Sequence, residues 1–85
     1  MRKFDYVITD TVGIHARPAG TLAKLCKELG VQVTLEANGK SADATKLMAV
    51  MALGIKQGTN VSICVAGKEE EAAADKIEKF FRENL

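Results

Sequence analysis

The chain contains one histidine and one proline, His15 and Pro18, within the stretch GIHARPAG at residues 13–20. Imidazole is the side chain best suited to act as a nucleophile or proton carrier near neutral pH. Arg17 follows two residues later and presents a planar, permanently charged set of donors that matches phosphate oxygens. These residue types at this spacing predict chemistry on a phosphoryl group at His15.

The same stretch predicts the start of a helix, which would supply backbone donors as well. Pro18 suits the first helical turn, where its missing N–H group leaves no helical hydrogen bond unmade. The free N–H groups of Ala16 and Arg17, together with the helix dipole, then form a site for an anion. We therefore expect Ala16, Arg17 and Pro18 to bind the phosphate, with His15 as the residue that carries it.

The alternative for a lone histidine at this position is a surface side chain that only marks a helix start. One histidine cannot form a metal site, and no cysteine or carboxylate cluster lies beside it in the sequence, so we expect neither a metal nor a cofactor. No serine–histidine–acid arrangement is apparent either. The combination of glycine, histidine, arginine and proline in one short stretch favours the phosphate chemistry.

Around this stretch, the hydrophobic periodicity predicts four strands and three helices. Apolar residues alternate in the strand segments and recur every three or four residues in the helical ones. Asn38 and Gly39 predict a tight hairpin turn, because a type I′ turn needs positive φ at both central residues. The order is β-α-β-β-α-β-α, over residues 3–10, 16–29, 31–37, 40–42, 44–54, 61–66 and 67–85.

Strands with one apolar and one mixed face are typical of an antiparallel sheet that is covered on one side only. We therefore expect an α+β open-faced sandwich, with the helices on one face of the sheet. The 85 residues predict one domain, residues 1–85, and leave no room for a second core. Hydrophobic residues make up 47% of the chain, which suffices for a compact core.

Composition also excludes several classes of function. The net charge is only +1, from 12 basic and 11 acidic residues, whereas general nucleic-acid binders show a large basic excess. The start of the chain is charged and lacks an apolar signal segment, and no apolar stretch reaches transmembrane length. Cys26 and Cys64 lie among apolar residues, so we expect buried free thiols rather than a disulfide. These features predict a cytoplasmic protein without stable membrane association.

Three motifs of this chain resemble the HPr family, the histidine-containing phosphocarriers of the bacterial phosphoenolpyruvate:sugar phosphotransferase system. They are GIHARPA at residues 13–19, NGKSADA at 38–44 and KLMAVMALGIKQGT at 46–59, and the resemblance extends over essentially the whole chain. It implies a four-stranded antiparallel sheet covered on one face by three helices. It also implies that enzyme I phosphorylates His15 on Nδ1, giving pros-phosphohistidine, and that sugar-specific enzyme II A components receive the group. Arg17 would assist this transfer.

The helix within the third motif is almost entirely apolar, and a short helix cannot bury all of these side chains. We expect Val50 and Leu53 in the core, and Leu47 and Met48 partly exposed as a docking patch, while Met51 fits either position. Methionine suits a surface that meets several partners of different shape, and the HPr resemblance implies the same patch. The complete set of candidate docking residues is Ile14, Lys24, Lys27, Leu47, Met48 and Met51.

The remaining candidates on this surface each have a second interpretation. Lys24, Lys27 and Lys46 are either a ring of charge that attracts acidic partner surfaces and raises the association rate, or ordinary solvated lysines. Ile14, just before His15, is either an exposed apolar contact or a residue that packs against the helix start.

Lys46 occupies the position at which Gram-positive members of the HPr family commonly carry a regulatory serine. Lysine cannot accept a phosphate ester, so the resemblance does not extend to that kinase-controlled switch. Thr45 is one residue earlier and is the remaining candidate for modification, because a helix start would stabilise its phosphate.

Two other functions compete with the phosphocarrier. A regulatory protein of the HPr type would dock to enzymes or transcription factors through Leu47 and Met48, and would need neither His15 nor Arg17. A nucleic-acid binder ranks last, because the few aromatic residues form no stacking pair on a central strand. We therefore expect a monomeric phosphocarrier that is not itself an enzyme, with enzyme I and enzyme II A components as its partners and with no nucleic acid.

Overall fold

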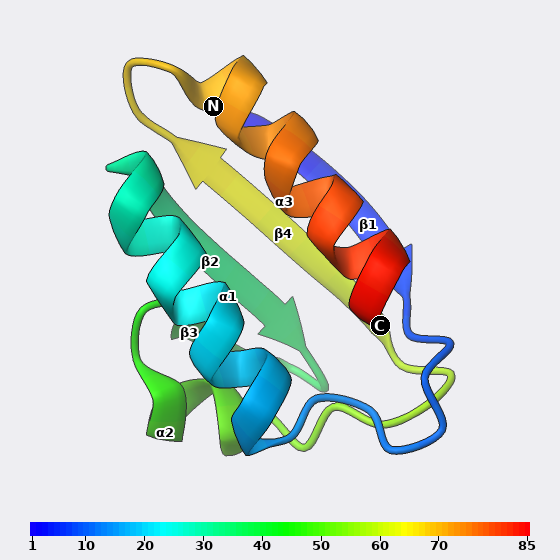
Figure 1. Cartoon of the computed structure of the whole chain (residues 1–85). Coiled ribbons are helices and arrows are strands. Elements are labelled where there is room, and N and C mark those ends of the chain that lie inside the picture. The colour runs from blue at the N-terminus through cyan, green and yellow to red at the C-terminus, as the bar shows by residue number, and fades with distance from the viewer.

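The computed structural model describes the whole chain, residues 1–85, and contains the seven elements in the predicted order. None of its helices combines the length and the apolar character that a membrane span requires. The elements, shown in Figure 1, are β1 (Arg2–Val7), α1 (Ala16–Leu29), β2 (Gln32–Ala37), β3 (Lys40–Asp43), α2 (Leu47–Met51), β4 (Asn60–Ala66) and α3 (Glu70–Asn84).

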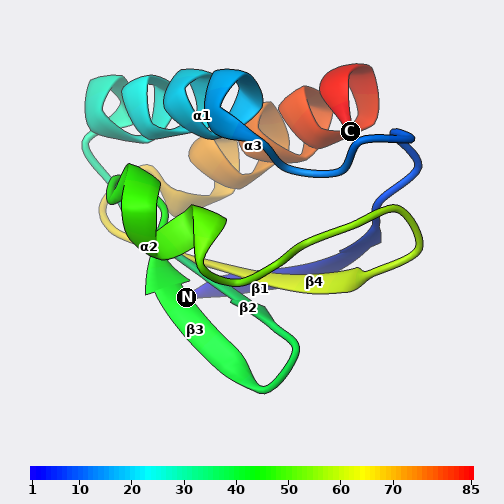
Figure 2. The ribbon, with the colours of Figure 1, turned by 90° about the horizontal axis from the view of Figure 1, so that it is seen from below.

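The four strands form one antiparallel sheet in the order β1-β4-β2-β3, with β1 and β3 at its edges. Helices α1 and α3 lie across one face of this sheet, and α2 lies against α1 near β3 (Figures 1 and 2). The opposite face carries no helix (Figure 2). The predicted α+β open-faced sandwich, a four-stranded sheet with three helices, is therefore confirmed.

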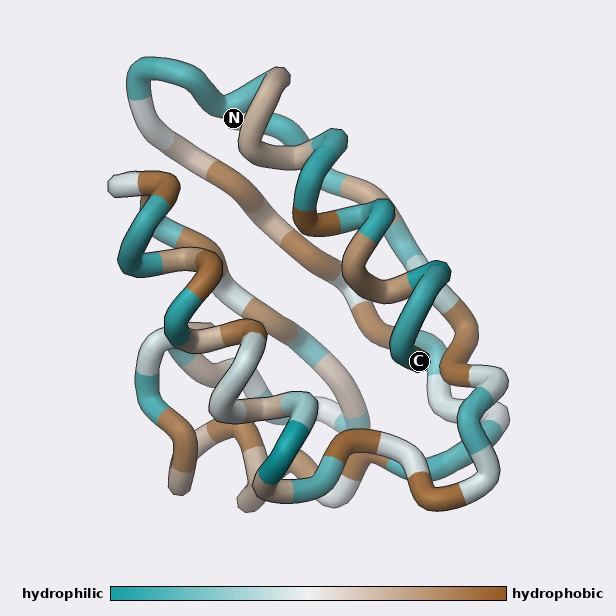
Figure 3. Tube along the Cα trace, viewed as in Figure 1, coloured by the Kyte–Doolittle hydropathy of each residue, from teal (hydrophilic) through white to brown (hydrophobic).

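The core lies between the sheet and the helices. Val61, Ile63 and Val65 of β4 point to the helices and are fully buried, while the residues between them point to the open face. The ring of Phe81 on α3 packs edge-on against Tyr6 of β1, with ring centroids 5.6 Å apart. Figure 3 shows that hydropathy alternates along the strands, whereas apolar residues recur at intervals along the helices. Because one face of each strand is buried and the other is not, the alternation of apolar residues in the sequence predicted the strands.

Helix α2 is shorter than predicted. The expected helix covers 44–54, but the observed helix begins at Leu47, ends at Met51 and continues as a turn to Gly54. Asp43 explains the late start, because its Oδ1 accepts hydrogen bonds from the N–H and the hydroxyl of Thr45, at 2.9 and 2.7 Å. Such a local side-chain bond competes with helix formation and holds the chain in a turn.

The two cysteines are both free but have different environments. Cys26 on α1 is fully buried, and this burial, with a smaller effect of the Asp43 carboxylate, raises the pKa of its thiol to about 12. Cys64 is only half-buried, so the prediction of a buried thiol is wrong there. The reason is its position between Ile63 and Val65, which makes its side chain point to the face of the sheet that carries no helix.

Candidate phosphate-binding site

His15 is the residue immediately before α1, and its backbone is extended, with φ −124° and ψ −174°. Its carbonyl accepts the first helical hydrogen bond, from the N–H of Ala19 at 3.0 Å. Its imidazole is exposed and makes no capping hydrogen bond to the helix. The ring is therefore free to react while the backbone of the same residue begins the helix.

The start of α1 leaves two backbone donors without a partner. The N–H groups of Ala16 and Arg17 make no hydrogen bond in the structure, and Pro18 has no N–H group to offer. The Arg17 guanidinium takes part in neither salt bridge of the protein. Unused donors and a free positive charge beside His15 are the components of an anion site.

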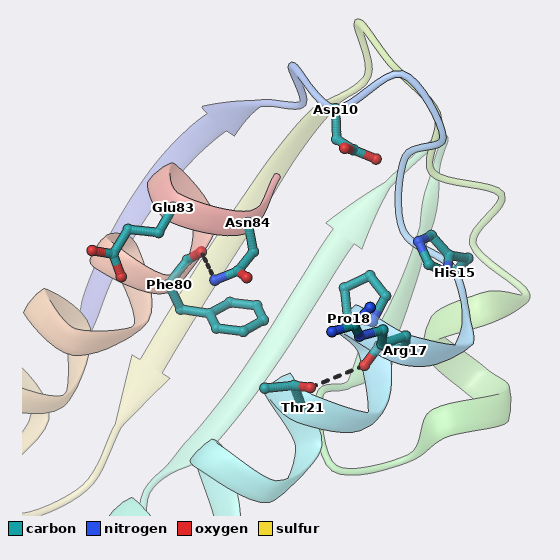
Figure 4. Close-up of a pocket in the computed structure, with 8 residues that line it drawn as sticks. All are labelled: Asp10, His15, Arg17, Pro18, Thr21, Phe80, Glu83 and Asn84. Carbon is teal, nitrogen blue, oxygen red and sulfur yellow. Dashed lines mark hydrogen bonds between the residues drawn. The ribbon is translucent and has the colours of Figure 1, made fainter.

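His15, Arg17 and Pro18 open onto a pocket of about 510 Å³ between the start of α1 and the end of α3, whereas Ala16 does not line it. Figure 4 shows His15, Arg17, Pro18 and Thr21 on one side and the α3 side chains on the other. Helix α1 and the loop before it were predicted, whereas the contribution of α3 was not. The residues that the sequence analysis missed are Asp10, Thr21, Phe80, Glu83 and Asn84.

Hydrogen bonds connect the residue that follows α3, Leu85, to the loop before His15. The N–H groups of Thr9 and Asp10 and the Thr9 hydroxyl all donate to the backbone oxygen of Leu85. Asp10 in turn accepts the N–H of Val12 on its side chain, at 3.1 Å, and the N–H of Gly13 on its carbonyl, at 3.2 Å. No sequence signal linked these segments, because they lie more than 65 residues apart in the chain.

A glycine fixes the last part of this loop. Gly13 is buried, has φ +78°, and a Cβ atom built on it would lie 2.5 Å from the carbonyl oxygen of Ile55. The next residue, Ile14, donates its N–H to that same oxygen at 3.2 Å. Only glycine allows so close an approach of the two backbones at this φ. The loop that carries His15 is thus held against residues 55–56.

Ile14 does not belong to a docking surface. Its side chain is 8% exposed and is part of the hydrophobic core, so its assignment as a docking residue is wrong. The N–H bond to Ile55 turns this residue inward, and the buried side chain anchors the start of α1. The second interpretation, a residue that packs at the helix start, agrees with the structure.

Helix α2 presents an apolar patch, which consists of Leu47, Met48 and Met51. These side chains are 37%, 76% and 38% exposed, whereas Val50 and Leu53 of the same region are buried. Helix α2, which carries this patch, lies against α1, the helix that follows His15. Val12, in the loop before His15, is a further exposed apolar side chain that the sequence analysis did not single out.

The three candidate lysines are all exposed, and none forms a salt bridge. Lys24 and Lys27 lie nine and twelve residues from His15, which corresponds to about 14 Å and about 18 Å along the helix axis. They line no part of the pocket. Lys24 and Lys27 therefore lie away from the phosphate site, and Lys46 directly precedes Leu47 of the apolar patch.

Thr45 is poorly placed as a phosphorylation site. Its hydroxyl donates to the Asp43 carboxylate, and this bond, followed by that of the Thr45 N–H and the charge of Lys46, lowers the pKa of Asp43. A phosphate on Thr45 would face that carboxylate and lose its hydrogen bond. A five-residue helix such as α2 also offers only a weak dipole.

Comparison with known proteins agrees with this geometry. The family model described as the phosphorylation site of the phosphotransferase HPr component matches residues 2–83. The phosphocarrier protein HPr of Mycoplasma capricolum is 40% identical over 79 residues, which cover 93% of this chain and 89% of that protein.

Solved structures show the same relationship. A mycoplasma histidine-containing phosphocarrier protein superimposes with a TM-score of 0.90 at 38% identity and covers 96% of this chain and 93% of its own. An HPr dimer from Thermoanaerobacter tengcongensis superimposes with a TM-score of 0.74 at 28% identity, over 98% and 95% of the two chains. The chain belongs to the HPr family, the phosphocarrier proteins of the phosphotransferase system.

Proposed function

We propose that His15 accepts a phosphoryl group from phosphorylated enzyme I on Nδ1 and passes it to enzyme II A components. The observation that carries this proposal is the exposed imidazole beside the unused N–H groups of Ala16 and Arg17. In the first transfer, the bond between phosphorus and enzyme I breaks as the bond to Nδ1 forms, and Nδ1 attacks through its lone pair. The second transfer reverses these roles, with His15 as the leaving group.

The site contributes position and electrostatics rather than covalent chemistry. The amides of residues 16 and 17 and the Arg17 guanidinium, which have no other partner in the structure, are the donors that we expect to bind the phosphoryl oxygens. Each such dipole or charged hydrogen bond contributes roughly 0.3–3 kcal/mol. A few contacts of this size stabilise a phosphohistidine without preventing its onward transfer.

The apolar patch of Leu47, Met48 and Met51 is the surface on which we expect both partners to dock. Three exposed and unpaired lysines, Lys24, Lys27 and Lys46, would favour partners with acidic surfaces by raising the association rate. One apolar patch of flexible methionine side chains suits partners of different shape. Transfer and recognition are then performed by neighbouring but separate residues.

The same proposal covers the remaining properties of the protein. It acts as one domain, residues 1–85, in the cytoplasm, where phosphoenolpyruvate is available. It is a carrier without enzymatic turnover of its own, works without a cofactor, and is a monomer during transfer. Because an HPr dimer is known from Thermoanaerobacter tengcongensis, light scattering over a range of concentrations is the measurement for the last point.

Incubation with phosphoenolpyruvate and enzyme I tests the transfer. We expect one phosphate per chain that is labile in acid and stable in alkali, and its absence in the His15→Ala variant. Circular dichroism of the variant controls for folding, and the exposed position of His15 predicts an unchanged spectrum. A wild-type protein that stays unmodified but still binds enzyme I would indicate regulatory docking instead.

A further inference from the structure

The docking helix α2 is too short to hold its own conformation. It has five residues, and isolated helices below about 12–15 residues are marginal in water because the first turn is costly to form. Its conformation therefore depends on contacts outside the helix, which are the burial of Val50 and Leu53 and hydrogen bonds at both ends. The hairpin formed by β2 and β3 supplies a side chain to each end.

At the far end, Asn38 of the hairpin turn donates through Nδ2 to the carbonyls of Leu53 and Gly54, at 2.9 and 3.3 Å. These carbonyls lie in the turn that ends the α2 segment and would otherwise lack a donor. The turn itself requires only a residue with positive φ at position 38, where φ is +53°. Glycine would satisfy that requirement, so the amide of Asn38 has a role beyond the turn.

At the near end, Asp43 receives the N–H and the hydroxyl of Thr45, and its carbonyl accepts the N–H of Lys46 at 2.9 Å. Lys46 is the residue immediately before α2. The hairpin thus binds the chain on both sides of the helix, with Asp43 before it and Asn38 after it.

We propose that Asn38 is a positioning residue for partner docking, and that it holds the apolar patch of α2 in a fixed orientation relative to His15. Ile55 follows Gly54 directly, and its carbonyl accepts the N–H of Ile14 in the loop that carries His15. The residues bound by Asn38 are therefore adjacent in sequence to the contact that fixes the reactive loop. The proposal rests on the docking function assigned above to Leu47, Met48 and Met51.

The first test is the Asn38→Gly variant in phosphorylation by enzyme I under steady-state conditions. Glycine keeps the positive φ of the turn and removes only the amide donors. We expect the KM for this protein to rise about fivefold, the factor that corresponds to one lost hydrogen bond of about 1 kcal/mol, with kcat unchanged. Lys40→Ala, an exposed substitution in the same hairpin, is the matched control and should leave both constants unchanged.

The second test does not depend on a partner. Amide hydrogen exchange at Ala52, Leu53 and Gly54, whose N–H groups bond within the α2 segment, should become at least fivefold faster in Asn38→Gly. Asn38→Asp, which keeps the size of the side chain and lacks the donors, should behave in the same way. Unchanged amide hydrogen exchange in both variants overturns the positioning role of Asn38, even if phosphorylation proceeds. If amide exchange is faster in the variants but enzyme I does not phosphorylate the wild-type protein, Asn38 still positions α2 and the transfer function is overturned.

Discussion

The pocket at the start of α1 and the apolar patch on α2 are neighbours with opposite properties. The pocket is polar, and its lining residues come from the loop before α1, α1 itself and the end of α3. The patch consists of three side chains from one short helix, and Met48 is its most exposed member. The pocket offers donors with fixed directions, which a phosphoryl group needs. The patch offers apolar contact area without directional hydrogen bonds, which is the property that the proposed docking of differently shaped partners requires.

The two regions also differ in how they are held. The pocket depends on backbone hydrogen bonds, such as those from Thr9 and Asp10 to the backbone oxygen of Leu85. The patch depends on side chains of the hairpin, Asp43 and Asn38. Ile55 connects the two sets of contacts, because its carbonyl accepts the N–H of Ile14 and it directly follows Gly54, whose carbonyl accepts from Asn38. Substitutions in the pocket should therefore change the chemical step, and substitutions in the patch should change binding.

Arg17→Ala should have the largest effect on this comparison. Removal of one preorganised donor from a transition-state site lowers a rate by about 10²–10³. We expect a loss of this order in kcat for phosphorylation by enzyme I, with little change in KM, measured by stopped or quenched flow. Arg17→Lys keeps the positive charge but lacks the planar guanidinium, so its kcat should lie between those of the wild type and Arg17→Ala. A main effect on KM would contradict the assignment of Arg17 to the chemical step.

Gly13→Ala should damage both regions together, because Gly13 lies where the reactive loop touches residues 55–56. The added Cβ would meet the Ile55 carbonyl and the Cα of Lys56 at 2.5 and 2.8 Å, and the positive φ adds about 1–3 kcal/mol of strain. We expect a fall in Tm of roughly 10 °C by calorimetry. Gly58→Ala is the control, since it has φ +86° and open space around the added atom. Equal losses in the two variants would show that the close approach is unimportant.

Met48→Ala should weaken docking without slowing transfer. Truncation of an exposed apolar contact in an interface often lowers the affinity by about 1 kcal/mol, which is about fivefold. The expected result is a higher KM with enzyme I and an unchanged kcat, and titration calorimetry gives the affinity directly. Met48→Leu retains most of the apolar area and should restore the wild-type KM. A fall in kcat in Met48→Ala would mean that the patch and the pocket are not separate.

Asp43→Asn should have the smallest effect, because asparagine keeps an Oδ1 acceptor for Thr45 and loses only the charge, which slightly lowers stability at neutral pH and changes its pH dependence. Hydrogen bonds from Thr45 lower the pKa of Asp43 in the folded protein, so its charged form adds stability above the unfolded pKa of about 3.8. That contribution disappears as the pH falls through the lower, folded pKa. Urea unfolding should therefore show that the wild-type advantage over Asp43→Asn shrinks between pH 5 and pH 2. A constant difference over this range would contradict the assignment.

The sequence could predict the part of the site that is local in the chain. His15, Ala16, Arg17 and Pro18 all belong to one helix start, and helix starts have recognisable residue preferences. The α3 side of the pocket, with Phe80, could not be predicted. It depends on tertiary packing between segments at opposite ends of the chain, for which periodicity contains no information.

The fold was predicted for the same local reason, since strand and helix periods differ. Three errors remain, and each has its own local cause. Ile14 is turned inward by its backbone bond to Ile55, and the bonds of Asp43 to Thr45 shorten the expected second helix. Cys64 shares a strand with buried neighbours but points the other way. The first two features have no signature in hydropathy, whereas the alternation along β4 does place Cys64 on the face opposite Ile63 and Val65.

The contrast between the two thiols makes site-specific labelling possible without mutagenesis. Cys26 is shielded and stays protonated at any pH used for maleimide coupling, because its pKa is about 12. Cys64 is accessible on the face of the sheet that carries no helix. A dye attached there would report on partner binding from the opposite side of the molecule, without occupying the surface that the partners are expected to use.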